Sequence, residues 1–260
     1  MRYGISIIGI IPVRKEPDER SEMVSQILFG ESYEVIDRKG NWLQVVMQFD
    51  AYQGWIDKKL FTRLGDAAYN QYIMVPPPVL DAIIMEIEIP GSGPMLIPAG
   101  SSLPGFNSEA GTLGPEGRIF QVNRVFDQVS LYQKQGVVTL AEKFINTPYL
   151  WGGRSVFGFD CSGYVQVVFK ILGVTLHRDA SQQALQGDAV SGLSEILPGD
   201  LVFFTGETGI VNHVGIAHSP GTIIHCSGWV RKDKLDEQGI YNEALQKYTH
   251  HLRQIRRIML

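Results

Sequence analysis

The sequence predicts an α+β chain, in which two small β-rich modules precede a domain whose helices come before its sheet. Short strand-like segments recur at about ten-residue spacing over residues 1–64, a pattern typical of a small barrel. A second β-rich stretch with many prolines and glycines covers residues 72–130. Over residues 131–260, helix-like segments are followed by apolar strands, which is an α+β layout.

The first module, residues 1–64, alternates apolar and polar positions in short runs. The strand-like runs cover residues 5–8, 33–37, 42–47 and 52–56, and Lys39–Asn41 forms a turn between two of them. Residues 65–75 predict a linker helix or loop, and three prolines at 76–78 make a stiff break.

The second module, residues 72–130, predicts a strand over residues 82–89, a turn over residues 90–94 and a strand over residues 120–126. It has no clear repeat in common with the first module. We therefore expect a second, more divergent barrel.

The third region, residues 131–260, predicts a helix over 136–145 that ends before Pro148, then a second helix starting at Cys161. The turn at 197–200 leads into three apolar strands. We place those strands at residues 201–204, 212–218 and 222–227, a surface helix at 241–248 and a last strand at 253–259.

Cys161 is the residue that first suggests chemistry. Asp160 before it is a good helix N-cap, and Gly173 is a plausible stop. The first turn of a helix favours a thiolate through unpaired N–H groups and the helix dipole, so we expect a lowered pKa and a reactive thiol. One buried helix face is predicted from Tyr164, Val165, Val168, Phe169 and Leu172.

A cysteine nucleophile needs a base, and the base needs a residue that orients it. If residues 219–221 form a three-residue hairpin loop, His218 faces Thr222 and Gly215 faces His225. His213 and His225 then share one sheet face as diagonal neighbours, about 7–8 Å apart, and His218 points to the other face. A two- or four-residue loop would put His213 and His225 on opposite faces.

Two alternatives use the same residues. Zinc could be held by Cys161, His213 and His225, although no fourth ligand or short metal spacing is evident. A disulfide could join Cys161 to Cys226, but two cysteines in an apparently cytosolic chain argue against it. We interpret Cys226, in the middle of a strand, as buried and inert, and expect neither a metal nor another cofactor.

The composition narrows the class of protein. A net charge of -4 gives no indication of nucleic-acid binding, and no apolar run approaches the roughly 20 residues of a membrane span. The first residues resemble a strand more than a signal peptide, so we expect a cytoplasmic, monomeric protein; a trimmed exported protein would look the same.

Several motifs resemble one known family. The segment 159–165 (FDCSGYV) looks like the nucleophile motif of the NlpC/p60 cysteine peptidases, and 212–216 (NHVGI) looks like their base strand. Residues 149–153, 197–204 and 224–225 also fit, so the resemblance covers about residues 131–230. The segments "NWLQV" and "GWI" resemble a bacterial SH3-like domain. The resemblance implies a papain-like catalytic domain behind two SH3-like barrels, with no circular permutation.

The resemblance also implies roles for individual residues. Cys161 would be the nucleophile, His213 the base and His225 the orienting residue, with Tyr149 and the Cys161 N–H at the oxyanion. Asp160 would meet the free amine of the substrate. The remaining pocket residues would be Trp151, Ser162, Ser181 and, from the first barrel, Tyr52.

The whole chain is similar to the γ-D-glutamyl-L-diamino acid endopeptidases, the dipeptidyl-peptidase VI group. The implied substrate is a murein tripeptide or tetrapeptide, L-Ala-γ-D-Glu-diamino acid, with a free amino end, and L-Ala-D-Glu is the implied product. The alternatives are a hydrolase of intact peptidoglycan, a thioester-forming acyltransferase or amidase, and a wall-binding module without activity. An intact set of Cys161, His213 and His225 argues against the last.

Overall fold

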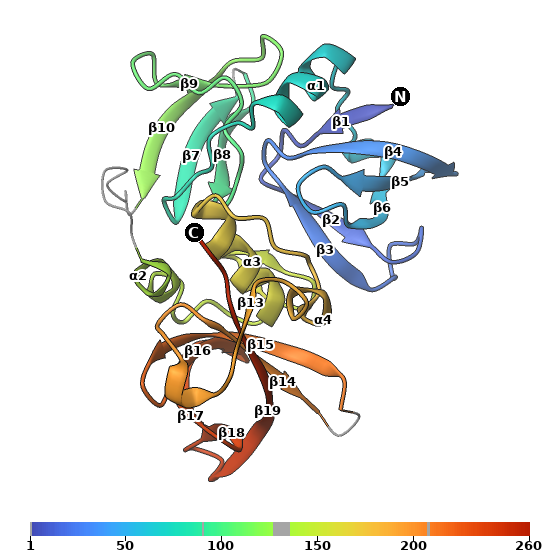
Figure 1. Cartoon of the computed structure of the whole chain (residues 1–260). Helices are drawn as coiled ribbons and strands as arrows, with labels where there is room; N and C mark the ends of the chain where they lie inside the picture. The colour runs from blue at the N-terminus through green and yellow to red at the C-terminus, as the bar shows by residue number, and fades with distance from the viewer. Residues whose placement is uncertain (1, 90, 127–135, 207–208) are drawn as a thin grey trace. The chain divides into compact units, whose positions relative to one another are not determined.

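The computed structural model describes residues 2–89, 91–126, 136–206 and 209–260. The chain divides into two compact units, residues 1–130 and 131–260 (Figure 1). The boundary predicted near residue 130 falls within residues 127–135, and part of the turn predicted at 90–94 falls on residue 90; both lie outside the described residues.

Six antiparallel strands form the first sheet of the first unit, in the order β1–β4–β5–β6–β2–β3. In β5, Leu43, Val45 and Met47 are buried and alternate with partly exposed residues, so the period-two pattern of the sequence gives the barrel its core. The strands are β1 (Tyr3–Ile5), β2 (Ile10–Arg14), β3 (Met23–Leu28), β4 (Ser32–Lys39), β5 (Trp42–Met47) and β6 (Gln53–Asp57), followed by the short 3-10 helix η1 (Lys58–Leu60).

The second sheet of this unit has four strands, in the order β8–β7–β10–β9. Phe29, at the end of β3, joins the core of the second sheet and meets Phe120 edge to face, with ring centroids 5.5 Å apart. The two predicted modules therefore pack together in one unit. The elements are α1 (Asp66–Met74), β7 (Ile84–Ile89), β8 (Gly93–Pro98), β9 (Thr112–Leu113) and β10 (Phe120–Phe126).

The second unit is built on an antiparallel sheet in the order β13–β19–β14–β15–β16–β17–β18. A further pairing between β18 and β19 closes six of these strands on themselves. The strands are β13 (Asp188–Val190), β14 (Leu201–Thr205), β15 (Val211–Ser219), β16 (Thr222–Ser227), β17 (Trp229–Asp236), β18 (Gly239–Asn242) and β19 (Lys247–Arg257).

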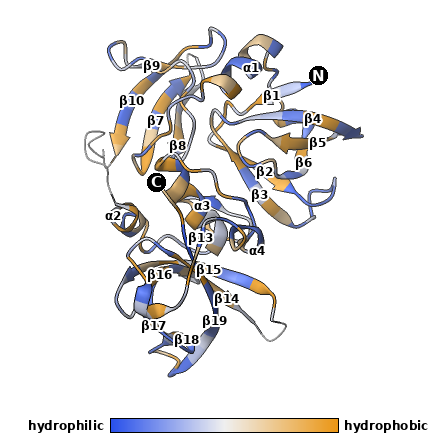
Figure 2. Ribbon diagram, viewed as in Figure 1, coloured by the Kyte–Doolittle hydropathy of each residue, from blue (hydrophilic) through white to orange (hydrophobic). Residues whose placement is uncertain are grey.

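Helix α3 (Cys161–Ile171) lies against β15 and β16 (Figure 1). Every residue from Cys161 to Lys170 is buried, so the helix is enclosed and does not present one apolar face only. Figure 2 shows apolar residues in α3 and along the strands of both units. The other elements are α2 (Val137–Glu142), β11 (Arg154–Ser155), β12 (Gly158–Phe159), α4 (Ala180–Gln183) and the 3-10 helix η2 (Leu193–Glu195). Across the described part of the chain, no helix has the length and hydropathy of a membrane span.

The surface helix predicted over residues 241–248 is wrong. Tyr241 ends up in β18 and Tyr248 in β19, directly paired, with ring centroids 5.2 Å apart. The chain turns between them, with Gln246 at a φ of 52°. Burial of Ile240 and cross-strand pairing of the tyrosines outweigh the local helical pattern. The sequence pattern also missed β17, in which five of the eight residues are charged.

The hairpin between β15 and β16 confirms one predicted pairing and corrects another. Gly215 faces His225 as predicted, but Ser219, and not His218, faces Thr222. A β-bulge between Ala217 and Ser219 leaves one residue of β15 out of the pairing. The loop is therefore shorter than predicted, while Gly215 still faces His225. This bulge is why a short loop still leaves His213 and His225 on one face.

Candidate active site

A cavity of about 340 Å³ opens in the second unit beside the first residue of α3. It gathers side chains and backbone from α3, four strands and the loops between them. The lining residues are Tyr149, Cys161, Thr205, Gly206, Asn212, His213, Cys226, Ser227, Gly228, Thr249 and His250.

Cys161 is placed where the sequence predicts it, in the first turn of α3, and its side chain borders the cavity. Its Sγ lies 3.9 Å from the carbonyl oxygen of Asn212, alongside the backbone of β15. Burial raises the pKa of the Cys161 thiol to about 12, and the neighbouring Asp160 adds to the rise. The lowered pKa expected from the helix start is therefore not found, because loss of hydration outweighs the N–H groups nearby.

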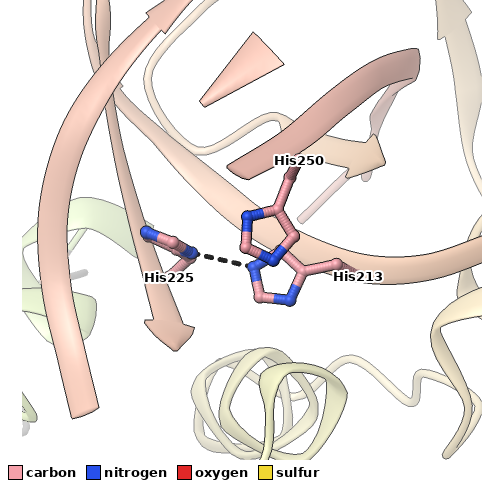
Figure 3. A group of neighbouring side chains, drawn as sticks. All are labelled: His213, His225 and His250. Atoms are coloured by element: carbon pink, nitrogen blue, oxygen red, sulfur yellow. Dashed lines mark hydrogen bonds between the residues drawn. The ribbon is translucent and has the colours of Figure 1, made fainter. Parts of the chain in front are cut away.

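Two histidines of neighbouring strands are joined directly. Nε2 of His213, on β15, lies 2.8 Å from Nδ1 of His225, on β16, and both rings are buried (Figure 3). Nε2 of His225 lies 3.0 Å from a carboxylate oxygen of Asp233, on β17. A third bond, 2.7 Å long, joins Arg231 to the other oxygen of Asp233. Three consecutive strands thus supply one line of polar contacts.

This line fixes where the protons lie. Burial raises the pKa of Asp233, but hydrogen bonds from His225 and Arg231 outweigh it and hold that pKa below its ordinary value. An ionised carboxylate only accepts, so His225 carries its proton on Nε2. Neutral His225 then accepts at Nδ1, so His213 donates from Nε2. The Nδ1 of His213 is left with its lone pair, on the side of the ring nearest the β15 backbone that Cys161 contacts.

Both histidines are held uncharged. Burial lowers the pKa of His213 well below its ordinary value, and His225 and His250 lower it further. Burial also lowers the pKa of His225, although Asp233 opposes that effect. Neutral His213 with a free Nδ1 lone pair can accept a proton from the Cys161 thiol, which is the task of a general base.

His250, on β19, stacks on His213 with ring centroids 4.0 Å apart and an angle of 26° between the planes. Burial lowers the pKa of His250 to about 4, so this ring is also neutral near pH 7. One nitrogen from each of His213, His225 and His250 lies within 4.8 Å of the others. These three residues are the group best able to hold a metal ion in the described part of the chain.

Asp160 is the anchor of the α3 N-terminus. Its carboxylate accepts from the backbone N–H groups of Gly152 and Gly163, from the Ser162 hydroxyl and twice from Arg178. Arg178 is also buried and donates to Ser162. A carboxylate has about four lone-pair sites, so these five hydrogen bonds leave none of them free. Asp160 and Ser162 therefore hold the start of α3 in place. Their contact with substrate stays a prediction.

The other predicted pocket residues lie in different places. Tyr149 borders the cavity, its N–H donates to the carbonyl of Gly228, and burial raises the pKa of its phenol. Within the described residues, neither Trp151, which is 60% exposed, nor Ser181, which is exposed on α4, borders the cavity. Tyr52 packs on the core of the six-stranded sheet in the first unit. Substrate binding by Trp151, Ser181 and Tyr52 stays a prediction.

Sequence reasoning missed Asp233, Arg178 and His250 as parts of the site. Asp233 faces Ile223 across β16 and β17, diagonal to His225, and recognising β17 as a strand would have found it. Arg178 lies 18 residues after Asp160, and only the fold brings the two together. His250 lies far along the chain, and the pairings of β19 with β14 and β18 bring it to the cavity.

Two parts of this chain match known protein families. Residues 146–254 match the NlpC/P60 family, and residues 13–59 match the bacterial dipeptidyl-peptidase Sh3 domain. The gamma-D-glutamyl-L-lysine dipeptidyl-peptidase of Bacillus subtilis (strain 168) is 31% identical over 77% of this chain and 71% of that protein. The dipeptidyl-peptidase 6 of Lysinibacillus sphaericus is 27% identical over 86% of this chain and 88% of that protein.

A solved structure shares the fold over nearly the whole length. The NlpC/P60 family protein from Bacillus cereus ATCC 10987 superposes with a TM-score of 0.79 at 20% identity, covering 98% of this chain and 99% of that one. An NlpC/P60 endopeptidase from Photobacterium damselae subsp. piscicida gives a TM-score of 0.71 at 16% identity, over 97% of this chain and 70% of that one. With its matched domains and its relatives, the chain belongs to the NlpC/P60 family.

Proposed function

We propose that this protein is a cysteine peptidase that hydrolyses the γ-D-glutamyl–diamino acid bond of murein peptides with a free L-alanine amino end, releasing L-Ala-D-Glu. The observation that carries the proposal is the hydrogen-bonded line from His213 through His225 to Asp233, with Cys161 and His213 bordering the same cavity. The name of the Bacillus subtilis relative supports the bond, the names of both relatives support release of a dipeptide, and the Sh3 domain match supports the architecture.

The mechanism follows from the proton positions. In the resting state, the Cys161 thiol and the His213 imidazole are both uncharged, because burial moves their pKa values apart. As the sulfur attacks the γ-carbonyl carbon, the thiol proton moves to Nδ1 of His213. The imidazolium that forms keeps its Nε2–H bonded to His225, and Asp233 stabilises its charge through that ring.

Hydrolysis is completed in two further steps. The tetrahedral intermediate collapses, the C–N bond breaks and the leaving amine takes the proton from His213. Water then attacks the thioester, with His213 again as the base, and frees the thiol and the D-glutamyl carboxylate. The Tyr149 phenol stays protonated because burial raises its pKa, so it can donate to the oxyanion together with the Cys161 N–H. Each such donor is worth about 3–4 kcal/mol.

The residues proposed to recognise the free amine of the substrate differ from the residues that carry out bond cleavage. Asp160 is already bonded to Arg178, so its charge is partly neutralised before any substrate binds. We propose, from the resemblance alone, that Tyr52 of the first barrel recognises the amino end of the substrate. Replacing Asp160 would be a poor test of amine binding, because an unpaired Arg178 left buried destabilises a fold by about 3–5 kcal/mol.

The substrate prediction compares L-Ala-γ-D-Glu-diamino acid peptides with and without an N-acetylmuramyl cap. We expect cleavage of the free peptide and slow cleavage of the capped one, since the cap removes the ammonium and adds bulk. Mass spectrometry of the products identifies the bond. Tyr52→Ala should relax the preference without abolishing turnover.

Substitution of each cysteine in turn provides a test variant and its matched control. Cys161→Ala should abolish cleavage, and Cys226→Ser should keep most of it, because Cys226 donates to the carbonyl of Phe159 and takes no part in the proposed steps. Similar rates on capped and free peptides would make the protein a hydrolase of intact wall. Products joined to an added amine would point to acyl transfer.

A second prediction concerns the charge of the thiol. A raised pKa means that the group stays protonated until the pH approaches that value, which is about 12 for Cys161. The ultraviolet absorbance of thiolate, measured as wild type minus Cys161→Ser in a Cys226→Ser background, should therefore be absent at neutral pH. Thiolate absorbance at neutral pH that disappears on acidification would mean a resting thiolate–imidazolium pair instead.

A third prediction concerns Asp233, as a positioning residue. In Asp233→Asn, Arg231 attracts the amide oxygen, so the amide NH₂ faces Nε2 of His225 and reverses both histidine tautomers. We expect kcat to fall at least about 100-fold, with KM little changed, because a wrong base tautomer can cost as much as 10⁴-fold. Asp236→Asn, on the same strand, should leave kcat unchanged.

A double variant tests the reason for this loss. In Asp233→Asn with Arg231→Met, the amide is free to turn its oxygen toward His225, so part of the activity should return. No return, with both proteins folded by circular dichroism, would show that the negative charge of Asp233 matters and the tautomer does not.

A further inference from the structure

Three imidazole rings converge beside the cavity, and the proposed hydrolysis uses only two of them. His213, His225 and His250 come from β15, β16 and β19, and one ligand nitrogen of each lies within 4.8 Å of the others. Figure 3 shows His225 bonded to His213, with the ring of His250 lying against that of His213. Imidazole nitrogen is a preferred ligand of zinc and of neighbouring transition metals.

Two of these nitrogens already have lone pairs. Asp233 holds the proton of His225 on Nε2, which leaves Nδ1 as an acceptor. The Thr249 hydroxyl lies 3.4 Å from the carbonyl of Ile240, to which it donates, and 2.9 Å from Nδ1 of His250, from which it accepts. Nε2 of His250 therefore keeps its lone pair. Histidines that bind metals are usually held in this way, through a hydrogen bond on the ring's other nitrogen.

The third nitrogen, Nε2 of His213, carries a proton in the resting protein and donates it to His225. A metal at this position would require the proton to leave Nε2 and a proton to be taken up at Nδ1. The two joined nitrogens lie 2.8 Å apart, whereas ligands of a tetrahedral zinc ion are about 3.4 Å apart. Binding therefore also requires the rings to rotate, because the His250 ring stacks on His213 with an angle of 26° between the planes.

We propose that the three histidines form an inhibitory site for a divalent transition-metal ion such as zinc, bound by Nε2 of His213, Nδ1 of His225 and Nε2 of His250, with water in the fourth position. The ion blocks catalysis by reversing the tautomer of the base. With Nδ1 protonated, His213 has no lone pair for the Cys161 thiol. Binding stands on the geometry alone, and its inhibitory effect rests on the proposed peptidase function.

The test measures zinc binding and inhibition separately. Binding is followed with zinc chloride by competition against a chromogenic chelator, using the full-length protein after EDTA treatment and removal of the EDTA. We expect one zinc ion per chain. His250→Phe keeps the stacked ring and removes the ligand, so zinc affinity should fall at least about tenfold, since even partners of ligands are worth 10–100-fold. His251→Phe, the adjacent exposed residue on the same strand, should bind zinc as wild type does.

Cys161→Ala should retain zinc binding, because the thiol is no ligand in this site. Loss of zinc binding in Cys161→Ala, or equal affinity in wild type and His250→Phe, would overturn the proposal; melting curves confirm that each variant is folded. In the peptide assay, zinc should inhibit wild type, EDTA should restore its activity, and His250→Phe should need at least about tenfold more zinc for half-inhibition of its own activity. Zinc binding without any peptide cleavage would overturn the proposed function and leave the metal site standing.

Discussion

The hydrogen bond between His213 and His225 is the contact on which the proposed chemistry, with His213 as the base, depends. It gives the base its tautomer only because Asp233 has already set the tautomer of His225. The strand order is what makes the line possible, since β15, β16 and β17 are neighbours in one sheet and each contributes one member. Burial keeps both rings neutral, so the base is ready for the thiol proton.

Cys161, the proposed nucleophile, is held by a separate set of contacts at the start of α3. Asp160 caps the helix and ties it to Arg178 and to the loop at Gly152, so the position of Cys161 follows from a buried ion pair. Such a pair is costly to break from one side, which makes it suited to fixing geometry. The sheet and the helix then meet at the cavity, each with one half of the thiol–imidazole pair.

The sequence predicts the core of this arrangement through local patterns. Helix-start chemistry indicated Cys161, and period-two spacing placed His213 and His225 on one face, although the pairing survives through a bulge that no pattern revealed. Asp233 and His250 were not predicted as site residues, because their positions depend on pairings of β17 and β19, which are set by tertiary contacts. The raised pKa of Cys161 was not predicted either, since burial is a property of the folded domain.

The proton positions of the two histidines are the most direct test of this account. Imidazole nitrogen NMR of the wild-type protein at neutral pH, with His213 and His225 assigned by single substitution, distinguishes the two neutral tautomers from the charged ring. We predict that both rings are neutral and carry their proton on Nε2. A proton on Nδ1 of His213, or protons on both of its nitrogens, would contradict the account, because that ring could not accept the proton of Cys161.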